Sequence, residues 1–510
     1  MTLEPSVKES EPLYYYRASG DVGFLFVIVA VPMLARLWLA ATVPLTEDEA
    51  YYRLWALAPA LSYLDHPPMV AWMMAAGRWI AGDSALGLRL AGVLASALST
   101  IVLWRTAVLL VGRRTANEAA LFAVTIPLLN VGAIVMTPDT PSVLFFVLGG
   151  WAIAELNSSR NANWWLAVGL FAGLGLLSKY TNFFFGLTIV IWILAVRRNW
   201  HWLGTWQLYA GGIIALALFI PVIWWNWIYG GASFDKQFGR VVDVDGFKLV
   251  WQLELWGALV LLLGPVLFGL AARGFLETAR RFKATHEPES ALLLALTAPL
   301  VVYFSLHALH GRVLPNWLAP AYPFFAILAA VGAASIPDAM ARHRAALSGA
   351  FVSAALTVLV YAHAVQPLYD SSRVKEPTQQ LRGWADFTAE VEKAAQGAKV
   401  AYIATTSYGT TGQLAFHLDR RWPVFQLTDR IRYVHLPEPD KGLLHKPGLV
   451  VELARRKPLS ELAARFTNID PLGSLTRNYL GLPLQTYAVY RVSNPVSDRM
   501  LGLPSFQKLE

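Results

Sequence analysis

The chain has 510 residues, of which 56% are hydrophobic and only 15% are charged. A soluble globular protein has about 45–50% apolar and about 25% charged residues, so this composition excludes a disordered chain, a coiled coil and an ordinary soluble enzyme, and predicts a polytopic membrane protein. Cysteine is absent, which also excludes disulfides, zinc–thiolate sites, iron–sulfur clusters and thiol catalysis. The net charge of +8 is expected to lie in cytoplasmic loops by the positive-inside rule, so no nucleic-acid partner is predicted.

The N-terminal part of the chain is apolar in long stretches. Residues 1–21 are predicted to form a cytoplasmic segment that leads into an uncleaved anchor. A spanning helix needs about 20 apolar residues, and about eleven candidate stretches form a predicted transmembrane domain over residues 22–365. They lie at 22–43, 86–111, 116–136, 141–156, 164–177, 183–196, 203–227, 250–272, 291–309, 317–336 and 346–365. The shorter apolar segment 69–80 favours an interfacial or re-entrant helix.

Basic residues indicate the orientation of these spans. With the N-terminus in the cytoplasm, thirteen lysines and arginines fall on the cytoplasmic side and seven on the other. An odd number of spans then puts the C-terminus in the periplasm, and the protein in the inner membrane of a bacterium. After a linker at 369–376, the pattern predicts helices at 381–395 and 408–418 and strands at 400–404 and 486–492. Residues 366–510 are therefore expected to form a small periplasmic α/β domain.

Polar residues cluster in the loops on the predicted periplasmic side. The first cluster, Glu47, Asp48 and Glu49, directly follows the first span and is followed in turn by Tyr52 and Arg53. Three carboxylates beside a membrane are costly unless they are solvated, paired or functional. The alternative for this cluster is a capping box at the start of a helix, with Glu49 three residues after a threonine.

Four more clusters follow along the chain. Asp65 and His66 precede a double proline, which in the alternative reading only terminates a helix. Asp139 lies in a tight turn where an Asx-turn would also explain it. Lys179 ends a span, as a snorkelling lysine also would. His310 and Arg312 lie in a loop that an interfacial aromatic belt would also explain.

Taken together, the five clusters suit one kind of chemistry. All fall on the same predicted side, where carboxylates and cations could act on a substrate with an anionic head group and a hydrocarbon tail. A carboxylate can take a proton from an attacking hydroxyl, and cations can stabilise a phosphate leaving group. Walker, GxGxxG, HExxH and GxSxG motifs are absent from the sequence, so ATP-driven, NAD-dependent, zincin and serine-hydrolase functions have no support.

Several of these motifs resemble those of the GT-C glycosyltransferases, in particular the superfamily of protein O-mannosyltransferases and aminoarabinose (lipid A) transferases. The resemblance rests on the acidic pair Asp48-Glu49 and on the segments 65–72, 137–141, 173–180, 314–322 and 405–416. It implies a GT-C transmembrane fold and transfer of a sugar, with inversion, from a polyprenyl-phosphate carrier to an acceptor hydroxyl. The acceptor would be lipid A or lipopolysaccharide, another envelope glycan, a lipid or a protein.

The resemblance also implies roles for residues. The catalytic base corresponds to Asp48, Glu49 completes the acidic pair, and Asp139 matches a second acidic position on the acceptor side. Aminoarabinose transferases have a lysine before the double proline, where this chain has His66, so Lys179 and Arg312 are the expected phosphate ligands. The full substrate-binding set is expected to comprise Glu47, Tyr52, Arg53, Asp65, His66, Lys179, His310 and Arg312.

Cofactor use and alternative functions complete the prediction. Some members of the family bind a divalent metal, which the resemblance therefore leaves possible, but we predict no required metal and no cofactor beyond the lipid-linked sugar itself. The main alternative function is a transporter or flippase of lipid-linked sugars, which would place charges near the membrane midplane and show inverted repeats. A non-catalytic lipid-binding or assembly protein is the second alternative.

Overall fold

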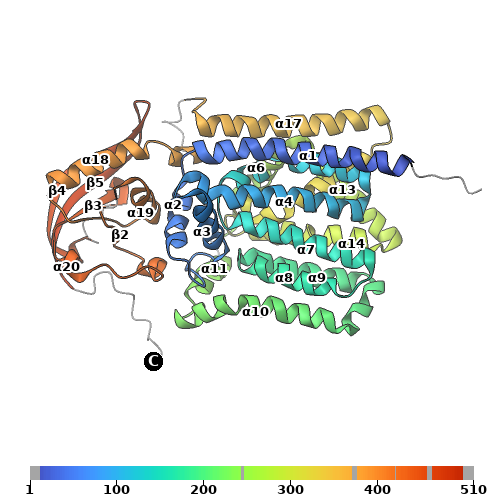
Figure 1. The fold of residues 1–510 in the computed structure, drawn as a ribbon, viewed down its shortest axis with the longest axis horizontal. Coiled ribbons are helices and arrows are strands. Elements are labelled where there is room, and N and C mark those ends of the chain that lie inside the picture. The colour runs from blue at the N-terminus through green and yellow to red at the C-terminus, as the bar shows by residue number, and fades with distance from the viewer. Residues whose placement is uncertain (1–11, 243–245, 370–375, 420, 457–461, 498–510) are drawn as a thin grey trace, which may run out of the picture.

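The computed structural model describes residues 12–242, 246–369, 376–419, 421–456 and 462–497 (Figure 1). A long helical bundle is followed by a smaller domain that contains a β-sheet, and this sheet domain packs against one end of the bundle (Figure 1). We call that end the domain end. The expected segment 1–21 lies partly outside the described residues, and the first helix, α1, already begins at Pro12.

The bundle confirms the predicted multi-pass membrane protein. Within the described residues, 7 helices are long and apolar enough to span a membrane, or up to 10 if each of three bent helix pairs counts as one span. One further expected stretch, 164–177, corresponds to the short helix α8 (Trp164–Leu176), which is not among these candidate spans. The seven straight spans are Gly23–Thr42 of α1, Ala85–Val111 (α4), Asp139–Ser159 (α7), Trp206–Ile228 (α10), Pro288–His307 (α14 and α15), Pro315–Ala334 (η3 and α16) and Ala339–Val365 (α17).

Two of the three bent pairs were expected as single spans, at 116–136 and 250–272, whereas only the first helix of the third pair was expected, at 183–196. The sequence explains the two bends in the expected spans. Helices α5 (Arg113–Ala123) and α6 (Pro127–Ile134) meet at 60°, and α12 (Leu249–Leu263) and α13 (Pro265–Thr285) meet at 103°. In each pair the second helix starts with a proline, which cannot donate the hydrogen bond that would continue the preceding helix. The third pair joins α9 (Phe183–Ala195) to the 3-10 helix η2 (Arg197–Gly204) at 115°.

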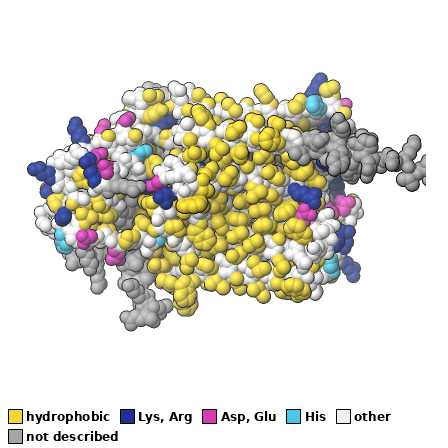
Figure 2. Space-filling model, in the orientation of Figure 1, with side chains coloured by type: hydrophobic (Ala, Val, Ile, Leu, Met, Phe, Trp, Pro, Cys, Tyr) yellow, Lys and Arg dark blue, Asp and Glu magenta, His cyan; other side chains and the backbone are white. Residues whose placement is uncertain are grey.

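The outer surface of the bundle is apolar, as the composition predicts. Large side chains such as Phe26, Ile213 and Phe351 are 71%, 67% and 74% exposed. Figure 2 shows hydrophobic side chains in a broad band over the bundle, with charged side chains gathered at the two ends. A contiguous apolar surface of this extent would be unstable in water and fits burial in lipid.

Three helices outside the candidate spans lie at the domain end (Figure 1). They are α2 (Glu47–Leu57), α3 (Met69–Ala81) and α11 (Ala232–Val242). The capping box considered in the sequence is present at the start of α2, where the Thr46 side chain accepts from the Glu49 N–H and the Glu49 carboxylate accepts from the Thr46 N–H. Helix α3 corresponds to the short apolar segment for which an interfacial or re-entrant helix was predicted.

The sheet domain confirms a small α/β unit after the bundle. Its five strands follow the order β2-β1-β3-β5-β4, with β1 parallel to β2 and β3, and β5 antiparallel to β3 and β4. The strands are Tyr402–Thr405 (β1), Val424–Gln426 (β2), Gly448–Leu453 (β3), Phe466–Tyr479 (β4) and Leu482–Pro495 (β5). The helices are α18 (Trp384–Gly397), α19 (Tyr408–His417) and α20 (Lys441–Leu444), with 3-10 turns η4 (Pro377–Leu381), η5 (Arg430–Tyr433) and η6 (Ala454–Arg456). The expected linker lies mostly outside the described residues, at 370–375.

The sheet domain is held to the bundle by a close contact between α19 and α2. A Cβ atom on Gly412 would lie 2.7 Å from the backbone of Ala50, and one on Gly409 would lie 2.6 Å from the Glu47 carboxylate. The Gln413 side chain donates a hydrogen bond to the Leu45 carbonyl at 2.8 Å. Because only glycine permits this approach, the two helices fix the sheet domain over the start of α2.

Candidate active site

A cavity of about 540 Å³ lies at the domain end, between the bundle and the sheet domain. We call it the large cavity. Its polar lining comes from α2, the loop after it, the start of α7, α11, η3 and the sheet domain. The polar and charged residues that line it are Asp48, Tyr51, Tyr52, Asp65, His66, Thr137, Asp139, Lys179, Tyr180, Thr181, Lys236, Gln237, Tyr303, His307, Asn316, Tyr408 and Arg432. Of the eleven predicted site residues, the structure brings together six: Asp48, Tyr52, Asp65, His66, Asp139 and Lys179.

Asp48 differs from the other carboxylates of the large cavity. It is half-buried on the first turn of α2, and its Oδ1 accepts a hydrogen bond of 3.1 Å from the Tyr408 hydroxyl. Burial raises the pKa of the Asp48 carboxyl, and the negative charges of Asp65 and Glu49 add to that rise. Asp65 and Asp139 each form ion pairs, whereas among the described residues no lysine or arginine pairs with Asp48.

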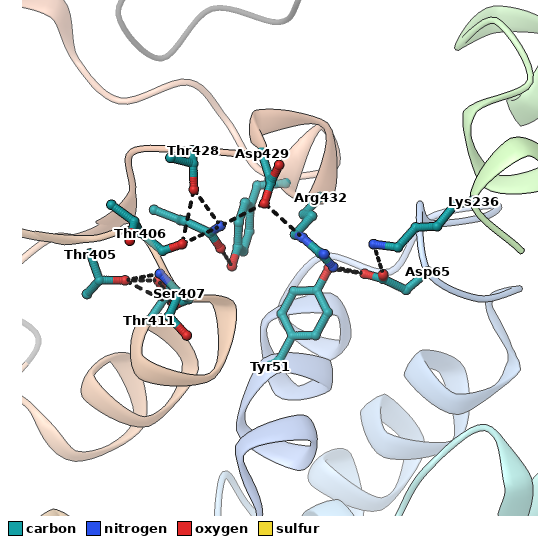
Figure 3. Close-up of polar contacts among 12 residues, drawn as sticks. Tyr51, Asp65, Lys236, Thr405, Thr406, Ser407, Thr411, Thr428, Asp429 and Arg432 are labelled. Carbon is teal, nitrogen blue, oxygen red and sulfur yellow. Dashed lines mark hydrogen bonds and ion pairs between the residues drawn. The ribbon is translucent and has the colours of Figure 1, made fainter. Parts of the chain in front are cut away.

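Asp65 lies between two cations that come from different parts of the chain (Figure 3). The Lys236 ammonium of α11 is 2.6 Å from Oδ1, and the Arg432 guanidinium of the sheet domain pairs with Oδ2, which also accepts from the Tyr51 hydroxyl at 2.8 Å. Burial alone would raise the pKa of Asp65, but Arg432 and Lys236 outweigh it and lower this pKa to about 2. Asp65 is therefore a fixed negative charge that holds two cations at the large cavity.

Arg432 is positioned by a polar network inside the sheet domain (Figure 3). The turn η5, which carries it, starts after Asp429, whose φ of 51° is in the left-handed region that aspartate tolerates. The Gln426 amide lies 3.4 Å from the Asp429 carboxylate and accepts from the Tyr433 hydroxyl at 2.7 Å. The guanidinium also lies 5.0 Å from the ring centre of Tyr408. The sheet domain thus supplies one cation and one hydroxyl to a cavity that is otherwise built by the bundle.

Asp139 opens α7 on the other side of the large cavity. Its Oδ1 is 2.6 Å from the Lys179 ammonium, and its Oδ2 accepts from the Asn316 amide at 2.8 Å. Asp139 and Lys179 were predicted to have separate roles, and the structure brings them into direct contact. Both hydrogen-bond partners of this carboxylate in the described structure, Lys179 and Asn316, come from distant segments and not from the turn that an Asx-turn would stabilise.

Glu49, expected to be catalytic, does not line the large cavity. Its side chain is fully buried and forms a two-pronged ion pair with Arg89 of α4, with both nitrogen–oxygen distances at 2.6 Å. The same carboxylate accepts from the backbone N–H groups of Thr46 and Met136 at 3.0 and 2.9 Å. These contacts occupy both oxygens, so the geometry assigns Glu49 a structural role in joining α2 to the bundle.

Four expected substrate-binding residues also lie outside the lining of the large cavity. Arg53 forms a two-pronged ion pair with Asp83 at 2.6 and 2.9 Å. The Arg312 side chain is 65% exposed and pairs with Glu254 at 2.7 Å. Glu47 packs under α19. His310 touches the ring of His307, which is the histidine of that motif that does line the large cavity.

Sequence reasoning missed Lys236, Arg432, Tyr408 and Asn316 as site residues. Lys236 carries a signal, because it is a lysine on the side where the positive-inside rule disfavours one. Asn316 lies inside a motif that was quoted for the family resemblance. Tyr408 likewise lies inside the segment 405–416 on which the resemblance rests. Arg432 lies outside all of these segments, so only the fold reveals that it reaches the cavity.

A metal site was left open by the family resemblance. Within the described residues, no group of three or more histidines, aspartates or glutamates is arranged to hold a metal ion. In the large cavity, both oxygens of Asp65 pair with cations, and the oxygens of Asp139 contact the Lys179 ammonium and the Asn316 amide. These carboxylates therefore do not fit a bound divalent cation.

Comparisons with known proteins agree with this architecture. Residues 65–225 match the family described as dolichyl-phosphate-mannose-protein mannosyltransferase. A curated relative, the lipid A galacturonosyltransferase RgtD from Rhizobium johnstonii, is 25% identical over 287 residues. That match covers 55% of this chain and 59% of the relative.

Two solved structures of ArnT from Cupriavidus metallidurans are similar over nearly the whole length. The apo structure gives a TM-score of 0.62 at 15% identity and covers 95% of this chain and 100% of ArnT. The structure bound to undecaprenyl phosphate gives a TM-score of 0.60 at 16% identity, covering 95% and 99%. The chain thus has the ArnT fold, and the resemblance predicted from its motifs is confirmed as a similarity of residues 65–225 to the mannosyltransferase family.

Proposed function

We propose that this protein is a glycosyltransferase that moves a sugar from a polyprenyl-phosphate carrier to an acceptor hydroxyl. The observation that carries the proposal is the large cavity, where Asp48, without a cation, faces a wall that holds Lys179, Lys236 and Arg432. A base that can accept a proton and cations that can receive a phosphate are the two requirements of this reaction. The cavity lies at the end of an apolar bundle, where a lipid carrier would present its head group.

The reaction would proceed by a single displacement. Asp48 takes the proton of the acceptor hydroxyl while the hydroxyl oxygen attacks the anomeric carbon. The bond between that carbon and the phosphate oxygen breaks, and its electron pair stays on the carrier phosphate. Attack from the face opposite the phosphate inverts the anomeric configuration. The raised pKa of Asp48 makes it a stronger base than an ordinary aspartate.

The relatives support the nature of the donor and the acceptor. One ArnT structure contains undecaprenyl phosphate, a polyprenyl phosphate, and the curated relative is named for transfer of galacturonic acid to lipid A. We therefore propose an envelope lipid or glycan as the acceptor. We also propose that residues 22–365 form the transferase domain, and that the cavity and the domain 366–510 face the periplasm of a bacterium.

The function is tested with the purified full-length protein. Polyprenyl-phosphate galacturonic acid and lipid A are incubated with it, and the product is identified by mass spectrometry and its anomeric configuration by NMR. Mass spectrometry of envelope lipids from a strain lacking the gene identifies the natural sugar and acceptor. Transfer with inversion supports the proposal. Movement of the intact donor across vesicle membranes without any transfer to an acceptor would instead support a transporter.

The cations of the large cavity are expected to control donor affinity. Lys179→Met and Lys236→Met each remove a charge that can bind the carrier phosphate, and each should weaken undecaprenyl-phosphate binding by about 10- to 100-fold, equivalent to about 1.5–3 kcal/mol. Microscale thermophoresis in detergent measures the Kd. Arg312→Met is the matched control, because Arg312 is exposed and lies outside the cavity lining. If Arg312→Met alone weakens undecaprenyl-phosphate binding, the carrier phosphate lies outside the large cavity.

The pH dependence of transfer should report the environment of Asp48. The base must be deprotonated, so the rate falls as the pH drops through its pKa, and burial places that fall above the ordinary aspartate value of about 3.9. The Tyr408 hydrogen bond stabilises the charged carboxylate, so Tyr408→Phe should move the acid limb to higher pH. A pH profile of kcat measures both effects. An acid limb that does not move in Tyr408→Phe would argue that Asp48 is not the titrating base.

A further inference from the structure

Besides Arg89, the bundle buries a second arginine, Arg36, beside the large cavity. Arg36 is 3% exposed and lies on α1, six residues before the helix ends at Thr42. At a rise of 1.5 Å per residue, this depth is about 9 Å below the end of the helix. A charged side chain at such a position in a spanning helix is costly, and its presence indicates a binding role unless another charge neutralises it.

No carboxylate neutralises Arg36 in the part of the chain that the structure describes. Its two terminal nitrogens donate to the Ser96 hydroxyl at 3.0 Å and to the Asn130 side-chain oxygen at 2.7 Å. Both acceptors are neutral, and the third nitrogen, Nε, is buried without a hydrogen-bond partner. Arg89, on the neighbouring helix, is equally buried but has the Glu49 carboxylate at 2.6 Å. Within the described part of the bundle, Arg36 thus differs from Arg89 in having no carboxylate partner.

Arg36 lines a separate, mostly apolar cavity of about 200 Å³, which we call the small cavity. Thr137, Asp139 and Asn316 line both this cavity and the large one. The small cavity therefore meets the proposed active site at Asp139, on the side away from the Asp65 cations. Its volume is below the roughly 300–1,000 Å³ of a pocket for a drug-sized ligand, so it suits one head group and not a whole glycolipid.

The bent pair α5 and α6 forms one wall of the small cavity. Residues 128, 129, 131–133 and 135 line it, and the Asn130 side chain donates to the Val124 and Ile126 carbonyls at the bend, at 2.9 Å each. Broken helices at membrane depth are tolerated where they line a cavity and are typical of binding sites. Asn130 thus connects Arg36 to the bend, and Arg36 and residues of the bend line the same small cavity.

We propose that Arg36 binds the anionic head group of a second membrane lipid, distinct from the carrier phosphate. In the reaction proposed above, on which this identification rests, that lipid is the acceptor: its anion lies on Arg36, and its hydroxyl passes Asp139 into the large cavity, where Asp48 can take the proton. The anion completes the hydrogen bonding of the guanidinium and neutralises its charge. The apolar walls from Leu103, Leu128 and Val143 receive the first carbons of its chain.

The experiment uses native mass spectrometry of the purified full-length protein in detergent, with short-chain phosphatidate and undecaprenyl phosphate as probes and diacylglycerol as the uncharged control. Wild-type protein should bind one molecule of each phosphate lipid at the same time. Arg36→Gln should weaken phosphatidate binding at least tenfold and leave undecaprenyl phosphate unchanged, and Arg36→Lys should retain part of the affinity. Ser96→Ala, which removes one hydrogen bond but keeps the charge, should bind both lipids.

A second variant covers the case in which Arg36→Gln does not fold. Gly132 lines the small cavity, and no atom lies within 4 Å of the position its Cβ would take, so Gly132→Leu fills part of the cavity while keeping Arg36 itself, and it should also reduce phosphatidate binding. The proposal is overturned if Arg36→Gln and Gly132→Leu both bind phosphatidate as tightly as the wild type, or if they lose only the binding of undecaprenyl phosphate. The measurement contains no sugar donor, so failure of the proposed transferase function would leave its outcome unchanged.

Discussion

Asp48→Asn is expected to lower kcat for glycosyl transfer by about 10²- to 10⁴-fold, the usual contribution of a general base. Asparagine has nearly the same shape and still accepts the Tyr408 hydrogen bond, but it cannot take the acceptor proton. Donor binding should be nearly unchanged, because the cations of the cavity remain. The rate is measured with a saturating donor, and donor affinity with undecaprenyl phosphate.

The same variant should not lose stability. A carboxyl whose pKa is raised in the folded state binds protons more tightly there than in the unfolded chain, so its contribution to stability decreases as the pH rises through that interval. Asp48→Asn removes this penalty, and its denaturation temperature at neutral pH should equal or exceed that of the wild type. The advantage should disappear in acid. Full activity of Asp48→Asn would refute the assignment of Asp48 as the base. If Asp48→Asn unfolds, its lost rate says nothing about catalysis, and the rate of Asp48→Glu is measured instead.

Glu49→Ala is expected to cause the largest loss of stability. It leaves the Arg89 guanidinium buried without its partner, and breaking a buried ion pair costs about 3–5 kcal/mol. The capping box of α2 is lost as well, at about 1 kcal/mol. The denaturation temperature in detergent, recorded at one heating rate, should fall far below that of the wild type.

An exposed ion pair provides the control for Glu49→Ala. Glu277 pairs with Arg281 one helical turn away, and the arginine side chain is 54% exposed, so Glu277→Gln should change stability by less than about 1 kcal/mol. Glu49→Gln, which keeps the shape and part of the hydrogen bonding, should lie between the two. A stable Glu49→Ala protein that has lost only its transfer rate would restore the catalytic role that the acidic-pair motif predicted.

The contrast between Asp48 and Glu49 shows what sequence reasoning can and cannot predict. The acidic pair was found from its position after the first span, and the resemblance assigned the base to Asp48, but Glu49 was still expected to take part in catalysis beside it. On a helix, neighbouring residues point in directions about 100° apart, so one carboxylate faces the cavity and the next faces Arg89. The capping-box pattern already contained the structural role of Glu49, whereas its partner Arg89, 40 residues later, required the fold.

The transmembrane part was largely predictable because apolar length determines a spanning helix. The bends between α5 and α6 and between α12 and α13 were missed, although Pro127 and Pro265 mark both positions. Contacts between distant segments carry no comparable signal in a single sequence. Arg432 reaches Asp65 across 367 positions, and only the docking of the sheet domain brings the two together.

The glycine contact between α19 and α2 has a consequence for how the reaction is controlled. Tyr408, the first residue of α19, donates to Asp48, the second residue of α2, and Gly412 sets the spacing of the same two helices one turn further on. The basicity of the proposed base therefore depends on how closely a water-facing domain is seated on a membrane-embedded one. A molecule that shifts the sheet domain against the bundle by a fraction of an ångström would change the hydrogen bond to Asp48, and with it the basicity of Asp48, without entering the large cavity. The contact between α19 and α2 is therefore a point where the reaction rate can be controlled.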